Sequence, residues 1–201
     1  MLNVTVDIVL DRLLIRDVLK AIISSIFFHR LFGSIRPISP PQEVLDLTYP
    51  SVDDPELEFF INDKLTKLTA ALDTASQAAL VTPHLAISHR GGGAQIAIAF
   101  YEKKTRKAWF SKSEEEVCWE QWTITVSSIT PRNENERALL SRSAEQQLQN
   151  ILFKIIDFVG ENKTHIPSIT SSEGNPFPYS IALPSEAEES WGSVFKKILV
   201  E

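Results

Sequence analysis

The chain has 201 residues, of which 43% are hydrophobic and 23% charged, and its formal net charge is −6. This composition predicts one domain spanning residues 1–201, large enough to bury a sizeable core. The acidic balance disfavours proteins whose main partner is nucleic acid. Cys118 is the only cysteine, which excludes an internal disulfide and favours a reducing, intracellular location. The first residues have no basic segment of the kind that opens a signal peptide, so we expect no secretion.

The first long element that the sequence predicts is a buried helix over residues 10–32, after a short apolar lead (Val4, Val6 and Ile8). A helix with a thin polar stripe must be covered on several sides, so we expect this one at the centre of the fold. The stripe consists of Arg12, Arg16, Lys20 and Ser24. The most apolar window, residues 18–32, is too short and too interrupted by charge to span a bilayer.

Two further helices have clear start signals. The run Asp53-Asp54-Pro55-Glu56 combines an acidic cap with a proline in the first turn, and it predicts a helix that extends to about Ala79. Pro131 and the asparagine- and glutamate-rich run over residues 133–136 precede a third helix, which we expect to end at Gly160. The apolar stripe of this third helix widens toward its C-terminal end, so it has more apolar surface than one sheet face easily covers.

Two strands are predicted over residues 95–101 and 120–126, because large apolar residues recur there at every second position. Weaker alternation predicts short strands over residues 44–48 and 85–89 and a late strand around Tyr179, Ile181 and Leu183. A short apolar element is expected over residues 191–200. Three long helices with these strands predict an α+β domain with a mostly antiparallel sheet.

Residues 103–116, between the two main strands, are predicted to form a long loop, since ordinary hairpin loops have about 2 to 5 residues. Its middle carries Trp109 and Phe110, with basic residues such as Lys107 before them and Glu114–Glu116 after them. Either the two rings fold back onto the core, or they protrude as anchors for another protein, as large aromatics do at interface hot spots. The basic flank would then keep the loop solvated and steer an acidic partner. Residues 103–110 would alternatively suit single-stranded nucleic acid or a membrane surface.

No pattern typical of an enzyme, a metal site or a cofactor site stands out. The four histidines lack the paired spacing of metal ligands. The glycine triplet over residues 91–93 is not followed by the Lys-Ser/Thr of a phosphate-binding loop. Cys118 has no neighbouring cation in the sequence, so we expect a partly buried, unreactive thiol. We therefore expect no metal or cofactor. An enzyme whose site leaves no sequence pattern stays an alternative, which a deep pocket with converging polar groups would favour.

Three stretches between residues 100 and 123 resemble the autophagy-related protein 101 family, whose members are HORMA-domain subunits of the autophagy-initiation kinase complex. The stretches are Phe-Tyr-Glu-Lys-Lys over residues 100–104, the Trp109-Phe110 pair, and Trp-Glu-Gln-Trp-Thr over residues 119–123. The resemblance extends back to residues 46–49 and forward to the late strand, so it covers most of the chain. It implies a HORMA-like fold, a sheet backed by three long helices, with a C-terminal belt-like segment from about residue 165. This segment looks short for a closed belt, which implies a permanently open form.

The resemblance also implies a function and its residues. The chain would be a non-catalytic scaffold that pairs with the HORMA domain of autophagy-related protein 13 and joins other autophagy-initiation subunits in the cytoplasm, at the phagophore assembly site. Trp109 and Phe110 would recruit downstream factors, with Lys107 beside them, and contact with membrane would be indirect. One residue separates the two aromatics in animal members; here they are adjacent, which would leave one ring protruding. The wide end of the third helix would contribute Leu152 and Ile156 to the dimer face.

Overall fold

The computed structural model describes residues 1–33, 36–39, 45–81, 93–108, 111–169 and 175–183, with the backbone alone for residues 75–81, 105–108 and 111–114. The helices are α1 (Ile15–Arg30), α2 (Pro55–Val81) and α3 (Glu134–Glu161), and a 3-10 turn covers Arg12–Leu14. The strands are β1 (Leu2–Asp11), β2 (Pro37–Ile38), β3 (Ser51–Val52), β4 (Gly93–Ala108), β5 (Ser111–Ile129) and β6 (Tyr179–Ala182). The strand expected over residues 85–89 and the apolar element expected over residues 191–200 lie outside the described residues.

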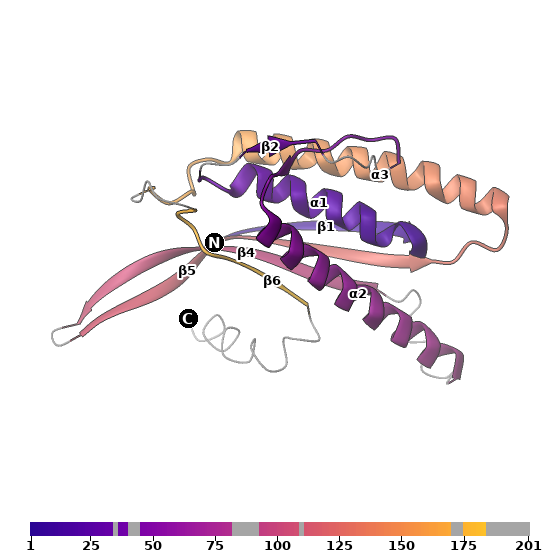
Figure 1. Cartoon of the computed structure of the whole chain (residues 1–201), viewed down its shortest axis with the longest axis horizontal. Coiled ribbons are helices and arrows are strands. Elements are labelled where there is room, and N and C mark those ends of the chain that lie inside the picture. The colour runs from indigo at the N-terminus through magenta and orange to yellow at the C-terminus, as the bar shows by residue number, and fades with distance from the viewer. Residues whose placement is uncertain (34–35, 40–44, 82–92, 109–110, 170–174, 184–201) are drawn as a thin grey trace.

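Four strands form the main sheet, in the order β1-β5-β4-β6. β1 runs parallel to β5, whereas β4 is antiparallel to both β5 and β6. A small second sheet pairs β2 with β3. Three long helices with a mostly antiparallel sheet confirm the predicted α+β class (Figure 1).

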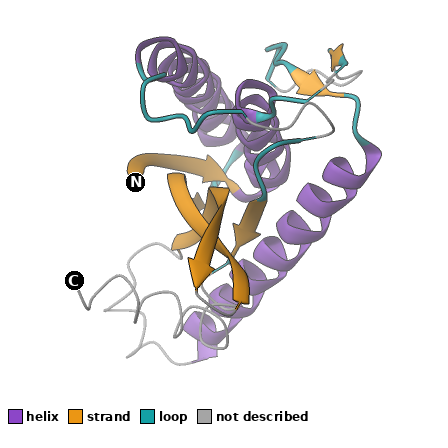
Figure 2. Cartoon of the chain, turned by 90° about the vertical axis from the view of Figure 1, so that its left-hand side faces the viewer, coloured by secondary structure: helices purple, strands orange, loops and turns teal. Residues whose placement is uncertain are grey.

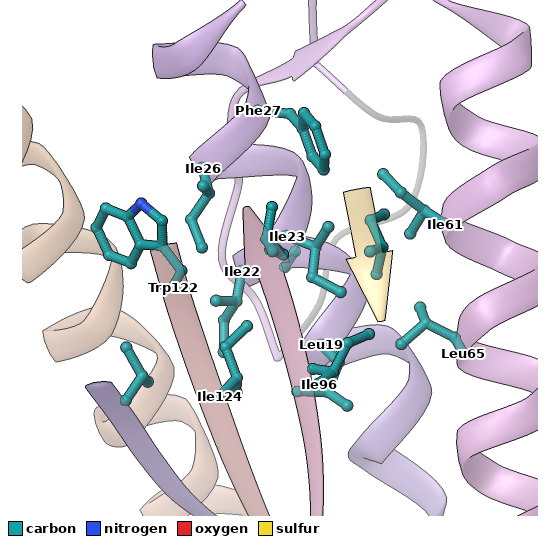
Figure 3. Close-up of a cluster of buried hydrophobic side chains, with 14 of the residues drawn as sticks. Leu19, Ile22, Ile23, Ile26, Phe27, Ile61, Leu65, Ile96, Trp122 and Ile124 are labelled. Atoms are coloured by element: carbon teal, nitrogen blue, oxygen red, sulfur yellow. The ribbon is translucent and has the colours of Figure 1, made fainter. Parts of the chain in front are cut away.

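The main sheet and the three helices share one hydrophobic core. Figure 3 shows α1 between α3 and α2, with its side chains pointing at the sheet, and Figure 2 shows the same arrangement end-on. Alternate residues of the strands, such as Ile96 on β4 and Trp122 and Ile124 on β5, are fully buried against α1. On the other side of α1, Ile61 and Leu65 of α2 complete the core. The period-2 prediction for the two central strands is therefore confirmed.

The central position predicted for the first helix is also confirmed, since most residues of α1 are buried. The polar row that precedes and enters the helix contacts α2. Arg12 donates to the carbonyl of Thr69 at 2.7 Å, and the Nζ of Lys20 lies 2.6 Å from Oε1 of Glu58. The polar stripe of this otherwise apolar helix therefore binds α2 through hydrogen bonds and ion pairs.

Two boundaries predicted from the sequence are wrong. The first helix begins at Ile15, because the alternation of the apolar lead continues through Leu10 and extends β1 to Asp11 beside β5. The strand expected over residues 44–48 is not formed in its described part: Leu45 and Asp46 have φ angles of 52° and 56°, in the left-handed region, which is incompatible with a strand. The strand of this region comes later, as β3.

The predicted helix starts are confirmed by their caps. Oδ1 of Asp54 accepts hydrogen bonds from the backbone N–H groups of Glu56 and Leu57, both at 3.0 Å. At the start of α3, Oδ1 of Asn133 accepts from the N–H of Glu136 at 2.9 Å. These bonds satisfy N–H groups that have no partner within the helix. Among the described residues, no helix combines the length and the apolar character that crossing a membrane requires.

Candidate partner-binding arm and helix face

Residues 103–116 form the outer part of a long hairpin, so the loop predicted there is wrong. The register of β4 with β5 continues from Tyr101↔Cys118 out to Ala108↔Ser111. β6 pairs with β4 only as far as Phe100, and among the described residues no third strand pairs with β4 or β5 beyond it. We call this two-stranded part, residues 101–108 and 111–118, the arm; Figure 1 shows it extending away from the helices. At about 3.3 Å per residue, its eight pairs span roughly 25 Å.

Charges of opposite sign face one another across the arm. Lys103 is paired in register with Glu116, and Lys104 with Glu115. Lys104 also lies 3.1 Å from Glu102 along its own strand. Opposite charges at directly paired positions stabilise a ribbon by a few tenths of a kcal/mol each. The outer two basic residues have no such partner in register, since Arg106 is paired with Ser113 and Lys107 with Lys112.

The predicted anchor residues occupy the far end of this arm. Trp109 and Phe110 are the two residues between Ala108 and Ser111, which are paired with each other, and they lie outside the described residues. The backbone of Lys107 is paired with Lys112, and its side chain is likewise outside the described part. The exposure of the two rings therefore stays a prediction, whereas the backbone that leads to them is a regular ribbon.

The base of the arm is marked by a β-bulge between Phe100 and Tyr101. Phe100 pairs with Glu120 and Tyr101 with Cys118, so Trp119 is the extra residue on β5. Because of this bulge, Trp119 and Glu120 are both buried although they are consecutive in a strand. The bulge thus brings an aromatic ring and a carboxylate together where the covered sheet ends.

The carboxylate of Glu120 is completely buried and accepts hydrogen bonds from three other side chains. Arg30, at the end of α1, donates from Nε and Nη2 at 2.7 and 2.9 Å. The indole N–H of Trp122 donates at 2.6 Å, and Nε2 of His165 lies 2.7 Å from Oε2. A buried ion pair with further hydrogen bonds is costly to break, because removing one partner leaves the other charge unpaired. Sequence reasoning missed this group, since Arg30 and Glu120 are 90 residues apart in the chain.

Two titratable groups at the base of the arm have altered acidity. Burial raises the pKa of the Cys118 thiol, which agrees with the expected partly buried, unreactive cysteine. Burial also raises the pKa of Tyr101, against the opposing effect of its hydrogen bond with Ser180 at 3.1 Å. Both groups are therefore neutral at physiological pH.

The outer face of α3 is a second exposed surface. Gln147 fixes the orientation of the helix, because its side-chain amide accepts from the N–H of Val9 at 3.0 Å and donates to the carbonyl of Val9 at 3.1 Å, on the outer edge of β1. Lys154 similarly donates to the carbonyl of Thr5 at 2.9 Å. These contacts cover open backbone groups of an edge strand. They turn the opposite side of α3 toward solvent.

The two candidate dimer residues on α3 have different surroundings. Ile156 is 48% exposed, whereas Leu152 is partly buried and packs against the core. Phe153, which was not predicted, is 55% exposed and lies three residues before Ile156, on the same side of the helix. The core-facing line of α3 (Ala144, Leu148, Ile151 and Ile155) lies on the other side. Counting helical positions from these core residues places Phe153 on the outward side, so the sequence pattern could have identified it as an exposed aromatic.

Among the described residues, no group of three or more histidine, cysteine, aspartate or glutamate side chains could hold a metal ion.

Comparison with known proteins identifies the family. The family profile described as Autophagy-related protein 101 matches residues 7–173. Autophagy-related protein 101 of Arabidopsis thaliana is 31% identical over 205 residues, which cover 92% of this chain and 88% of that protein. The protein of the same name from Schizosaccharomyces pombe is 28% identical over 204 residues, covering 99% and 95%. The one from Xenopus laevis is 22% identical over 173 residues, covering 79% and 72%. The chain belongs to the autophagy-related protein 101 family, with which its HORMA-like arrangement is consistent.

Proposed function

We propose that this chain is a non-catalytic scaffold of autophagy initiation that binds partners through two separate surfaces. Membership of the family supports a role in autophagy and in autophagy-initiation complexes. The proposal goes further: the α3 face pairs with the HORMA domain of autophagy-related protein 13, and the end of the arm recruits downstream factors. The protein acts in the cytoplasm, at the phagophore assembly site, as one HORMA domain.

The observation that carries the recruiting role is the arm itself. A regular ribbon leads away from the domain and ends on both sides of Trp109 and Phe110. Large aromatics at the end of such a ribbon are the residues that most often dominate the free energy of a protein interface. The charged residues of the ribbon keep it in solution, and the carboxylates opposite Lys103 and Lys104 reduce the attraction of its inner part to polyanions. The alternative role, in binding nucleic acid or a membrane surface through residues 103–110, is weakened by the carboxylates paired with Lys103 and Lys104.

The recruiting role is tested by changing Trp109 and Phe110 together to alanine. We expect autophagosome formation to be lost while the melting temperature and the pairing with the HORMA partner stay unchanged, because the proposal places neither ring in the core. A large drop in melting temperature would mean that the rings are packed inside, and it would overturn the proposal.

The observation that supports pairing through α3 is the exposed pair Phe153 and Ile156 on a helix whose other side is fixed by the core and by β1. The test is a pull-down with the HORMA domain of autophagy-related protein 13 in moderate salt. The double variant Phe153→Ser/Ile156→Ser should lose most of the binding. Leu139→Ser is the matched control, since Leu139 is 64% exposed on the same helix, about 21 Å away at 1.5 Å per residue. Unchanged binding of the double variant would rule out this face.

A further inference from the structure

The arm has to be held at its base, because a two-stranded ribbon has no core of its own. Isolated two-stranded hairpins are marginally stable in water. The inner halves of β4 and β5 are fixed by α1, whereas the arm begins at the bulge between Phe100 and Tyr101. A bulge bends its strand and increases the local twist. The contacts around this bulge therefore decide the direction in which the arm leaves the domain.

The extra residue of the bulge, Trp119, is held by rings. Its ring centroid lies 5.7 Å from that of Phe100, 5.3 Å from that of Phe177 and 5.5 Å from that of His165. The indole N–H is buried and has no hydrogen-bond partner among the described residues. Packing alone thus fixes the orientation of Trp119. Two of its three ring neighbours, His165 and Phe177, come from the segment after α3. This segment also contacts the first residue of the arm, since Tyr101 donates from its N–H to the carbonyl of Pro178 at 2.8 Å and shares a hydrogen bond with Ser180.

The same segment also reaches the neighbouring residue, Glu120. A carboxylate oxygen accepts, so Nε2 of His165 carries the hydrogen in the 2.7 Å contact with Oε2. Arg30 adds a weaker link, because its Nη2 lies 3.5 Å from the carbonyl of Asn162 as well as 2.9 Å from Glu120. His165 is therefore in contact with both consecutive residues of the bulged strand, with one through its ring and with the other through a hydrogen bond.

Among the side chains around Glu120, we expect that His165 can be substituted without loss of the fold. Its side chain is 20% exposed, whereas those of Arg30 and Glu120 are buried. When His165 is removed, Glu120 still has its two bonds from Arg30 and one from Trp122. The buried charge therefore stays compensated, and we expect the fold to survive.

We propose that His165 is a positioning residue that fixes the direction of the arm by joining the segment after α3 to Trp119 and Glu120. The structural part of this inference is independent of the proposed function. Its biological use rests on that function: the direction of the arm sets where Trp109 and Phe110 stand relative to the partner on the α3 face.

The test measures the arm directly, by distances between spin labels on the full chain. One label is placed at Ser113→Cys in the arm and the other at Gln149→Cys on the exposed side of α3, in a Cys118→Ser background. His165→Gln keeps an amide donor for Glu120, and His165→Asn has the same chemistry on a shorter side chain that does not reach. Lys163→Ala is the control, since Lys163 is an exposed residue of the same segment.

We expect one narrow distance distribution for the parent, for Lys163→Ala and for His165→Gln. His165→Asn should shift the distribution or make it about twofold wider, because the base of the ribbon then lacks the contacts of His165. His165→Phe, which keeps a ring beside Trp119, should behave like His165→Asn. A distribution for His165→Asn equal to that of the parent would overturn the proposal, and so would equal broadening in His165→Gln.

These distances need no partner protein. If Trp109 and Phe110 recruit nothing, the proposed function fails while the label distances still respond to His165. If the distances ignore His165 while the alanine variants of Trp109 and Phe110 lose recruitment, only the positioning role fails.

Discussion

The inner and outer halves of β4 and β5 are parts of the same two strands, yet they are stabilised in different ways. In the inner half, Ile96, Ile98 and Phe100 on β4 face Trp122 and Ile124 on β5 in one buried layer. In the outer half, the paired residues are mostly polar or charged and include two lysine–glutamate pairs, with no helix on either side in the described structure. Burial of apolar surface contributes about 25 cal/mol per Å², whereas an exposed cross-strand charge pair contributes a few tenths of a kcal/mol in total.

This difference separates folding from recognition within a single hairpin. The inner half determines whether the domain folds, and substitutions there carry large costs. The outer half is regular but contributes little to the free energy of unfolding, so its sequence is open to selection for a partner. The boundary between the two is the bulge with the Arg30–Glu120 pair beside it.

The largest expected effect is at this boundary. Arg30→Met should lower the free energy of unfolding by about 3–5 kcal/mol, because it leaves the buried carboxylate of Glu120 without its charged partner. Denaturant unfolding followed by circular dichroism measures the change. The double variant Arg30→Met/Glu120→Gln should recover a large part of the loss, since the buried charge is then removed as well. A cost of less than 1 kcal/mol for Arg30→Met would show that the pair is not essential to the inner half.

A smaller effect is expected for thiol reactivity on either side of the boundary. Cys118 should react with iodoacetamide about tenfold more slowly than a cysteine introduced at Lys104→Cys, because burial both restricts access and raises the pKa of the Cys118 thiol. The stability that this thiol contributes is present below its ordinary pKa and is lost as the pH rises above it, since the unfolded chain releases the proton first. Mass spectrometry of the alkylated peptides measures the rate of Cys118 in the parent protein and the rate of the introduced cysteine in the Lys104→Cys/Cys118→Ser variant. Equal rates would mean that the protected part of the sheet ends before Cys118.

The smallest effect is expected within the arm. Lys103→Ala and Glu116→Ala should each change the free energy of unfolding by less than about 0.5 kcal/mol, because both residues are exposed. Their coupling in a double-mutant cycle should be similarly small and should decrease with added salt. Amide hydrogen exchange of residues 101–108 should nevertheless become faster in the single variants. An effect of several kcal/mol on global unfolding would show that the arm belongs to the cooperative core.

The elements that the sequence predicted well are those with local causes. The caps at Asp54 and Asn133 and the alternation of Ile96, Ile98 and Phe100 are short-range patterns, and the structure confirms them. The sequence predicts a loop in place of the arm because the strands of the arm show no hydrophobic alternation, which is the pattern that marks a strand with a buried face. A signal for the arm was charge: a basic run is followed by an acidic run, and Lys103 and Lys104 pair with Glu116 and Glu115 when the chain turns back on itself.

The features that escaped sequence reasoning depend on distant segments. The contacts of Glu120 come from Arg30, Trp122 and His165, and only the fold brings them together. The alternation of β1 was cut short at Ile8 because Leu10 also fits a helical pattern. On α3, the widened stripe pointed to Leu152 and Ile156, but which of the two is exposed depends on how Gln147 and the core rotate the helix.

The exposure of Trp109 tests the central claim most directly, and hydroxyl-radical footprinting with mass spectrometry measures it in the free protein. Trp119 and Trp122, both buried at or near the base of the arm, serve as internal references in the same molecule. The account predicts that Trp109 is oxidised many times faster than either reference and that a bound downstream factor suppresses this oxidation. Oxidation of Trp109 as slow as that of Trp122 would show that its ring is packed in the interior, and it would contradict the account.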